Sequence, residues 1–160
     1  MSIPATATPK QQLWFLNTLV TVRVGHGDGE DGISVLESVA PHGDSPPLHI
    51  HQTEDEAFHV LEGELRLLAG DAEVRVGPGD WVLAPKGVPH TYRVESADGA
   101  RWIVVTTRGE FERFVRATSR PAERDELPEP AGPPTPEQAG ALAATARESG
   151  IAFVGPPLGG

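Results

Sequence analysis

Three histidines and one glutamate in this 160-residue chain have the types and the spacing needed to bind a metal ion. His49 and His51 are two residues apart, Glu56 follows five residues after His51, and His90 lies in a later segment. Side chains at positions i and i+2 of a β-strand point to the same side, so the first two imidazoles should meet at one point. Because three imidazoles and a carboxylate suit a divalent transition metal, we predict a metal centre formed by His49, His51, Glu56 and His90.

The composition limits the other chemistry that the chain can perform. It contains no cysteine, which excludes disulfides, thiolate ligands and cysteine nucleophiles. Its formal charge of −10 argues against a nucleic-acid partner, which requires clustered Lys and Arg. No apolar run of about 18 residues is present, and the N-terminus lacks a secretion signal pattern, so we expect no membrane contact and a cytoplasmic location.

The elements that must position these residues are predicted to be short strands. The 18 glycines and 16 prolines favour many strands joined by tight turns, and Gly70-Asp71 between two alternating segments indicates a hairpin. Strands are expected over 13–24, 33–39, 49–51, 56–62, 64–68, 72–76, 81–84, 90–95 and 101–107. The first of these should join the sheet at an edge or exchange with a neighbouring subunit. The pattern is typical of an antiparallel sandwich or a jelly roll.

The C-terminal part changes to a helical pattern. The segment EFERFVRA, residues 110–117, places its apolar residues on one helical face, and a proline-rich linker follows over 120–134. A second helix over 136–149 should begin at a capping box formed by Thr135 and Gln138. We expect this helix to pack on the barrel or on a partner without entering the metal site. The predicted organisation is a flexible N-terminus (1–12), a barrel with its following helix (13–116), and a linker with the C-terminal helix (117–160).

The two segments that carry the predicted ligands follow two sequence motifs. The first, G-x5-H-x-H-x4-E-x6-G, begins at Gly43 and ends at Gly63; the second, G-x5-P-x-G-x2-H, begins at Gly79 and ends at His90. In these motifs the chain resembles the cupin superfamily, and more specifically single-domain cupins similar to quercetin 2,3-dioxygenase. It departs from the pattern at Val94, where the family has Asn. The resemblance implies an all-β fold: a cupin jelly-roll β-barrel with C-terminal helices packed outside.

The resemblance also implies roles for the site residues. Glu56 would be both a metal ligand and the base that accepts the substrate hydroxyl proton, and the ion would be Fe, Ni, Co, Mn or Zn. Glu54, three residues after His51, is a rival ligand; Glu56 is preferred because it keeps the motif spacing to Gly63.

Strand parity separates the residues that should face the site from those that should not. Phe58, Tyr92 and Val94 share the parity of the ligands and are predicted to bind substrate. His59 has the opposite parity and should face away. Residues expected elsewhere are Trp81 and Trp102 in the core, and His26 and His42 in solvent.

Several functions remain open at this point. The first is a metal-dependent dioxygenase that acts on a flavonol-like or other enolisable aromatic substrate, with a small molecule and dioxygen as its partners. The second is a metal-dependent polyketide cyclase or isomerase that uses no oxygen. The third is a non-catalytic cupin that binds a small ligand or a metal, and the fourth is a structural barrel without metal. A homodimer is expected in each case, and the physiological substrate is not defined by the sequence.

Overall fold

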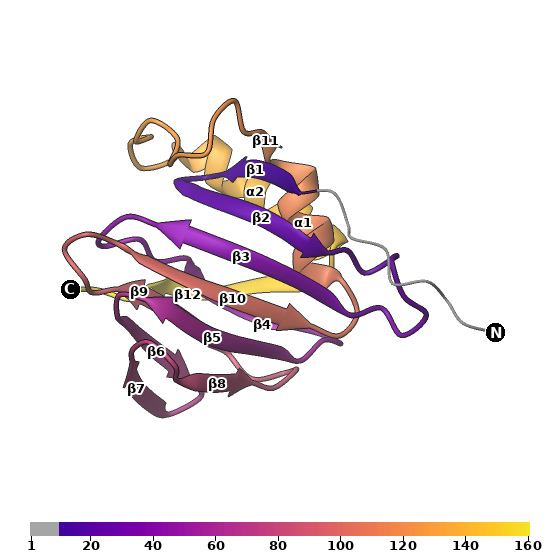
Figure 1. The fold of residues 1–160 in the computed structure, drawn as a ribbon, viewed down its shortest axis with the longest axis horizontal. Coiled ribbons are helices and arrows are strands. Elements are labelled where there is room, and N and C mark those ends of the chain that lie inside the picture. The colour runs from indigo at the N-terminus through magenta and orange to yellow at the C-terminus, as the bar shows by residue number, and fades with distance from the viewer. Residues whose placement is uncertain (1–9) are drawn as a thin grey trace.

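The protein folds as two antiparallel sheets that face each other, with two helices at one side (Figure 1). The computed structural model describes residues 10–160. The first sheet contains, in spatial order, β11 (Arg120–Pro121), β1 (Gln11–Phe15), β2 (Thr18–Val24), β3 (Ser34–Ala40), β10 (Ala100–Thr106), β5 (Glu56–Glu62) and β8 (Trp81–Ala84). The second contains β12 (Ile151–Pro157), β4 (Pro47–His51), β9 (His90–Val94), β6 (Leu65–Ala69) and β7 (Ala72–Val76). The helices are α1 (Glu110–Thr118) and α2 (Pro136–Glu148). This arrangement confirms the predicted all-β jelly roll.

The N-terminal segment differs from its prediction. The expected single strand over 13–24 is a hairpin, in which β1 pairs with β2 of the same chain across a turn at Leu16 and Asn17. Leu16 has a φ of 53°, and it is the one non-glycine residue of 10–160 with a positive φ. An apolar residue in this conformation gave no turn signal in the sequence. Gln11 and Gln12, expected to be flexible, belong to β1; the rest of that prediction, residues 1–9, lies outside the described residues.

The C-terminal segment contains a strand that the sequence did not reveal. β12 lies at the edge of the second sheet, where His51 pairs with Ile151 and His49 pairs with Phe153. Its prolines and Gly155 argue against a strand, but proline is tolerated on an edge strand because one side of the backbone makes no ladder hydrogen bonds. As a result, the end of the chain supports β4, the strand that carries two of the predicted ligands.

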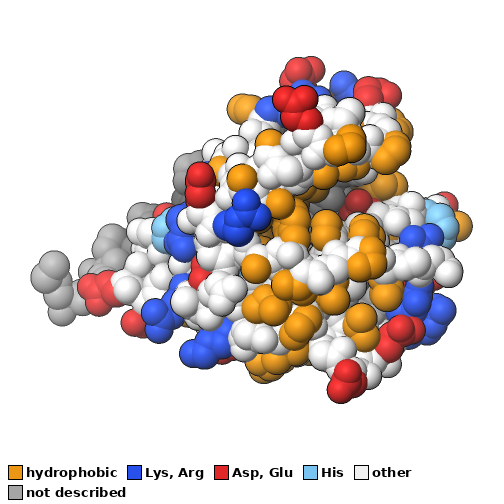
Figure 2. Space-filling model, turned by 180° about the vertical axis from the view of Figure 1, so that it is seen from behind, with side chains coloured by type: hydrophobic (Ala, Val, Ile, Leu, Met, Phe, Trp, Pro, Cys, Tyr) orange, Lys and Arg blue, Asp and Glu red, His pale blue; other side chains and the backbone are white. Residues whose placement is uncertain are grey.

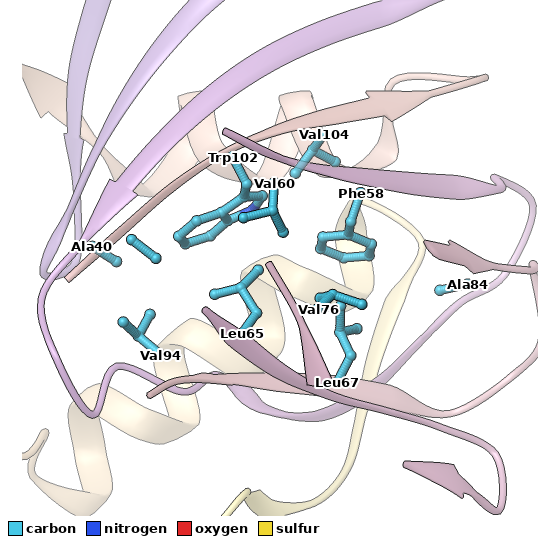
Figure 3. Packing of buried hydrophobic residues seen from close by; sticks show 11 residues of the cluster. Ala40, Phe58, Val60, Leu65, Leu67, Val76, Ala84, Val94, Trp102 and Val104 are labelled. Carbon is cyan, nitrogen blue, oxygen red and sulfur yellow. The ribbon is translucent and has the colours of Figure 1, made fainter. Parts of the chain in front are cut away.

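The main core lies between the two sheets. Alternate residues of β5 and β10 point inward and are buried, which is the two-residue periodicity of a strand with one solvent-facing side. Figure 3 shows the cluster from close by, with Trp102 among aliphatic side chains. Its labelled members are Ala40, Phe58, Val60, Leu65, Leu67, Val76, Ala84, Val94, Trp102 and Val104.

The outer face of the first sheet corrects one expectation and is consistent with another. Trp81, predicted to be in the core, is 60% exposed on the edge strand β8. Its indole stacks on the imidazole of His59, with ring centroids 4.2 Å apart. His59 therefore points away from the barrel interior, as its parity predicts. Trp102 is buried, as predicted.

Both predicted helices are present. On α1, Phe114 packs in a cluster with Ala146 of α2 and Ile151 of β12, so the two helices are held together and to the sheet. The capping box at Thr135 is complete, because Thr135 accepts from the Gln138 backbone while the Gln138 side chain accepts from the Thr135 backbone. Neither α1 nor α2, the helices of residues 10–160, has the length and apolar character needed to cross a membrane.

Candidate metal centre

The four predicted ligands come together at one point inside the barrel. His49 and His51 lie on the same face of β4, His90 pairs with His49 across the β4–β9 ladder, and Glu56 begins β5 on the opposite sheet. One potential ligand atom from each of these residues lies within 4.8 Å of the others. Histidines 51 and 90 and Glu56 are buried, whereas His49 is partly exposed. The register of three strands therefore places three nitrogens and one carboxylate within the reach of one ion.

The motif glycines explain why the chain can make these strand connections. Gly63, which ends the first motif, has a φ of 78° directly after β5. A Cβ at this position would lie 2.5 Å from the carbonyl oxygen of Gly99 and 2.9 Å from Ala100. Both the backbone conformation and the close packing therefore require glycine. This turn fixes the end of the strand that begins with Glu56.

The three imidazoles are held by hydrogen bonds from the nitrogen that faces away from the centre. Nδ1 of His49 donates to the Pro47 carbonyl at 2.8 Å, and Nδ1 of His90 donates to the Val88 carbonyl at 3.0 Å. Nδ1 of His51 contacts a carboxylate oxygen of Glu54 at 2.6 Å. Since these acceptors require the proton on Nδ1, each neutral ring presents the Nε2 lone pair to the centre. This is the tautomer that a metal ligand requires.

The electrostatics of the centre also suit a cation. Burial raises the pKa of Glu56, but the nearby His51 and His90 lower it by more, and the pKa falls to about 2. The carboxylate is therefore ionised. Burial and the nearby His90 lower the pKa of His49 to about 3, so this ring is neutral. Glu56 Oε2 lies 2.8 Å from His90 Nε2 and 3.3 Å from His51 Nε2. Lone pairs that face each other at these distances require a positive charge between them.

His51 shows how a proton and a metal ion compete for this position. Its pKa is raised: burial lowers it, but the carboxylates of Glu56, Glu54 and Glu110 raise it more. Its Nε2 is buried and has no hydrogen-bond partner among the described residues. A divalent ion would satisfy this nitrogen and would replace the proton that the three carboxylates otherwise stabilise. The residues present therefore fit a metal ion.

Glu54, the rival ligand in the sequence, has a different place in the structure. Its side chain is fully buried (0% exposed) on the Nδ1 side of His51, away from the Nε2 atoms. It also accepts hydrogen bonds from the backbone N–H groups of Glu110 and Phe111, at 2.9 and 2.7 Å. These are unpaired donors in the first turn of α1, where the helix dipole favours a negative charge. Glu54 thus connects α1 to His51 and orients the ring.

Glu110 is a second buried carboxylate that sequence reasoning missed. It accepts a hydrogen bond from the Thr53 backbone at 3.1 Å, and its Oε2 lies 4.0 Å from His51 Nδ1. His51, Glu54 and Glu110 form a second group whose potential ligand atoms lie within 4.8 Å. The nitrogen at the centre of this group, His51 Nδ1, already forms a hydrogen bond with Glu54. The only sequence signal for Glu110 was an acidic residue in the first turn of a predicted helix.

A cavity of about 690 Å³ extends from the candidate metal centre to the surface. His49, His51 and Glu56 line its inner end, and aromatic side chains form much of its wall. Figure 2 shows a hollow bordered by hydrophobic side chains, between the upper part of the molecule, which contains α2 in Figure 1, and the strands below it. A largely apolar small molecule could enter here and reach the centre.

The predicted substrate-binding residues do not all lie on this cavity. Phe58 and Tyr92 line it, whereas Val94 does not. Val94 faces the barrel interior, as its parity predicts, but it is 0% exposed and packed in the core cluster (Figure 3). Its backbone N–H instead donates to the carbonyl of Asp44 at 3.0 Å, which holds the β3–β4 loop. Parity gave the direction of the side chain but not its depth in the barrel.

The C-terminal helix forms part of the cavity wall, which the sequence did not indicate, but none of its residues is among the four predicted ligands. α2 packs on α1 and β12 as expected, but it also forms one wall. Its lining residues are Gln138, Ala139, Ala141, Leu142 and Thr145, and the linker adds Ala131, Gly132 and Pro134. The reason is the position of Ala146, which is buried with Phe114 and Ile151 and so places the preceding turns of α2 over the cavity. This contact is tertiary, and helical periodicity alone does not reveal it.

Comparison with known proteins agrees with this geometry. The cupin domain family matches residues 35–106. Quercetin 2,3-dioxygenase of Bacillus subtilis (strain 168) is 33% identical over 89 residues, which are 56% of this chain and 26% of that enzyme. An uncharacterized protein of Methanocaldococcus jannaschii is 32% identical over 57 residues, 36% of this chain and 46% of that protein. The matched regions thus span less than half the length of both relatives.

Solved structures support the fold. An RmlC-like cupin from Shewanella frigidimarina NCIMB 400 superposes with a TM-score of 0.54 and 14% sequence identity, covering 66% of this chain and 91% of that one. The cupin domain of Schizosaccharomyces pombe Cnp3 gives a TM-score of 0.53 and 15% identity, covering 72% and 78%. At these identities the similarity concerns the fold alone.

Proposed function

We propose that this protein, whose residues 35–106 form a cupin domain, is a metal-dependent dioxygenase that acts on a flavonol-like or other enolisable aromatic substrate. The observation that carries the proposal is the convergence of His49, His51 and His90 on Glu56, with each Nδ1 hydrogen-bonded away from the centre. The distant similarity to quercetin 2,3-dioxygenase supports the choice of reaction. The apolar cavity supports an aromatic substrate.

One divalent ion, which would be Fe, Ni, Co, Mn or Zn, is proposed to be held by the four residues. When bound, such an ion supplies Lewis acidity, which lowers the pKa of a coordinated hydroxyl, and the redox-active ions of this group support chemistry with dioxygen. Two units of positive charge less one carboxylate leave the centre net positive. An enolate or phenolate is therefore attracted to it, although the chain as a whole carries a formal charge of −10.

Glu56 is proposed to accept the proton of the substrate hydroxyl. A carboxylate whose pKa is near 2 is a weak base, so proton transfer is favourable only if the hydroxyl is itself acidified in the site. Glu54 holds His51 in position during this step. Phe58 and Tyr92 on one side, and α2 on another, keep the substrate ring against the centre and exclude water from it.

Oxygen consumption by the metal-loaded protein tests this proposal. The experiment follows loss of a flavonol such as quercetin in air and under nitrogen, together with oxygen uptake. Uptake that matches substrate loss supports the dioxygenase. Substrate loss at the same rate in air and under nitrogen would refute the dioxygenase and indicate a cyclase or isomerase. Ligand binding without turnover would indicate a non-catalytic binding protein.

A further inference from the structure

A polar pair lies in the wall of the cavity, apart from the four residues of the metal centre. Asp44 is in the β3–β4 loop and Tyr92 is in β9, and both line the cavity. The backbone of Asp44 is fixed at both of its polar groups: its N–H donates to the Pro41 carbonyl and its carbonyl accepts from Val94. The loop therefore presents the Asp44 side chain in a defined position.

The Asp44 carboxylate is only partly exposed and has few hydrogen-bond partners within the protein. Among residues 10–160 its hydrogen-bonding side chain is Tyr92, whose hydroxyl donates to Oδ2 across 3.3 Å, and no Lys or Arg of this range forms an ion pair with it. An O–H···O bond is usually 2.5–3.0 Å long, so this contact is weak. Burial raises the pKa of Asp44, and the bond from Tyr92 offsets this only in part. A carboxylate in an apolar cavity that has one weak hydrogen-bond donor is stabilised when a ligand supplies a second donor.

Tyr92 sets the chemistry of the group that would fit here. Because its hydroxyl hydrogen is directed to Asp44, its oxygen can only accept from the cavity side. Both polar groups thus accept hydrogen bonds, and the ligand must donate. The Tyr92 ring forms edge contacts with Phe58 and Trp102, at centroid distances of 6.4 and 5.0 Å, so the donor must be attached to an apolar or aromatic body.

The spacing between this pair and the metal centre matches a ring system. Tyr92 follows His90 by two residues on the same face of β9, which corresponds to about 6.5 Å along the strand. A ligand that presents one oxygen at the centre and carries a hydroxyl on a neighbouring ring can therefore reach both places. An ammonium group would also donate, but the net positive centre disfavours a cationic ligand in the same cavity.

We propose that Asp44 and Tyr92 form a hydroxyl-recognition subsite, and that the substrate is a mostly apolar, ring-containing molecule with a hydroxyl remote from the oxygen that meets the metal centre. Asp44 is then a specificity-determining residue. This inference rests on the proposed function, since the metal centre defines the other end of the ligand. The subsite selects among substrates, because molecules without the remote hydroxyl bind more weakly.

Isothermal titration of the metal-loaded chain with two flavonols, under nitrogen so that neither compound is oxidised, tests this subsite. 3-Hydroxyflavone carries the hydroxyl that would meet the centre, and quercetin carries additional phenolic hydroxyls. Asp44→Asn keeps the shape but removes the charge; Asp98→Asn, on the exposed β9–β10 connection, is the matched control. Asparagine still offers an oxygen acceptor, and a hydrogen bond to a charged group is stronger than a neutral one by about 1–1.5 kcal/mol, so Asp44→Asn should weaken quercetin binding by roughly 5- to 10-fold. The affinity for 3-hydroxyflavone should stay within about twofold, and Asp98→Asn should change neither.

A second variant keeps the test valid if Asp44→Asn does not fold. Tyr92→Phe retains the ring contacts and should lower the affinity for quercetin, by less than Asp44→Asn, without affecting 3-hydroxyflavone. Equal weakening of both compounds, no weakening of either, or no binding of either compound to the wild type would overturn the subsite. The metal content of the same samples separates the two proposals. If the chain holds one ion but Asp44→Asn does not distinguish the two flavonols, only the subsite is refuted. If the chain holds no ion, the proposed function is refuted.

Discussion

Replacing Glu54 by glutamine should weaken metal binding without abolishing it, because Glu54 orients a ligand and is not itself a ligand. The carboxylate accepts three hydrogen bonds, from His51 Nδ1 at 2.6 Å and from the backbone N–H groups of Glu110 and Phe111 at 2.9 and 2.7 Å. Glutamine keeps one oxygen but turns an NH₂ group toward a donor. Since one oxygen of Glu54 accepts from both His51 and Phe111, the glutamine oxygen takes that position and the NH₂ group faces the Glu110 N–H. His51 keeps an acceptor for its Nδ1 proton, but one without charge, so its ring is held less firmly.

The size of the effect follows from these contacts. A hydrogen bond to a charged acceptor is worth roughly 1 kcal/mol more than a neutral one, and one of the three bonds is lost altogether, so unfolding free energy should fall by about 2–4 kcal/mol. Mutation of an outer partner of a ligating histidine typically costs about 10- to 100-fold in metal affinity. We expect Glu54→Gln to bind the metal more weakly by this factor.

Chelator competition measures the metal affinity, and urea unfolding of the metal-free protein measures the stability. Glu62→Gln is a suitable control, because Glu62 lies at the end of β5 and its salt bridge with Arg101 is exposed and should contribute little. If Glu54→Gln binds metal as tightly as the wild type, the orienting role is wrong. If it binds none while Glu56→Gln still binds, Glu54 is the ligand and the assignment is reversed.

Three further predictions concern the base, the charge of the centre and the end of the chain. Glu56→Gln should retain metal in part but lower turnover by about 10² to 10⁴, measured as flavonol loss; recovery at raised pH, where the substrate is already ionised, supports the role as base, and full activity at neutral pH refutes it. In the metal-free protein the pKa of His49 is about 3, against 6.5 for a free histidine, so below pH 6.5 the unfolded chain binds a proton that the folded chain does not. The unfolding free energy measured with urea should therefore fall as the pH drops from 6.5 toward 3, by at most about 1.4 kcal/mol per pH unit and by less if water reaches the ring through the cavity. If the unfolding free energy of a His49→Gln variant falls with pH as steeply as that of the wild type, this explanation is wrong. Truncation after Pro134 removes β12 as well as α2 and so uncovers β4; it should lower both stability and metal affinity, and a truncated chain with wild-type metal affinity would show that β12 does not support the ligand strand.

The cluster of four potential ligands was predictable from the sequence because strand geometry is local and the two motifs fix the spacing. His49 and His51 share a face at any register of β4, and the motif spacing brought Glu56 and His90 to the same place. The boundaries of β5 and β8 agree with their predictions for the same reason, since alternation and glycine turns mark them. Apart from the place of His90, which followed from the second motif, these features depend on residues that are neighbours in the chain.

The parts that were missed depend on contacts between distant segments. The role of Glu54 requires the first turn of α1, more than fifty residues later. β12 forms a strand only because β4 offers it an edge. The place of α2 on the cavity is set by the packing of Ala146, and the depth of Val94 by its position along the barrel. No single window of sequence contains this information.

The expected homodimer stays a prediction. Trp81 and Leu83 are 60% and 57% exposed on β8, at the edge of the first sheet, and are places where a sheet-mediated contact could form. Light scattering of the wild type and of a Leu83→Lys variant measures this. A monomeric wild type would remove the expectation.

Elemental analysis of the purified chain shows whether His49, His51, Glu56 and His90 bind a metal ion. The protein is expressed without added metal, reconstituted separately with Fe, Ni, Co, Mn and Zn, and desalted; His51→Ala and His42→Ala are treated in parallel. His42 is exposed in the β3–β4 loop and serves as the histidine control. We expect one divalent ion per chain in the wild type and in His42→Ala, and none in His51→Ala. Equal metal in all three proteins, or none in the wild type with any of the five ions, would contradict this expectation.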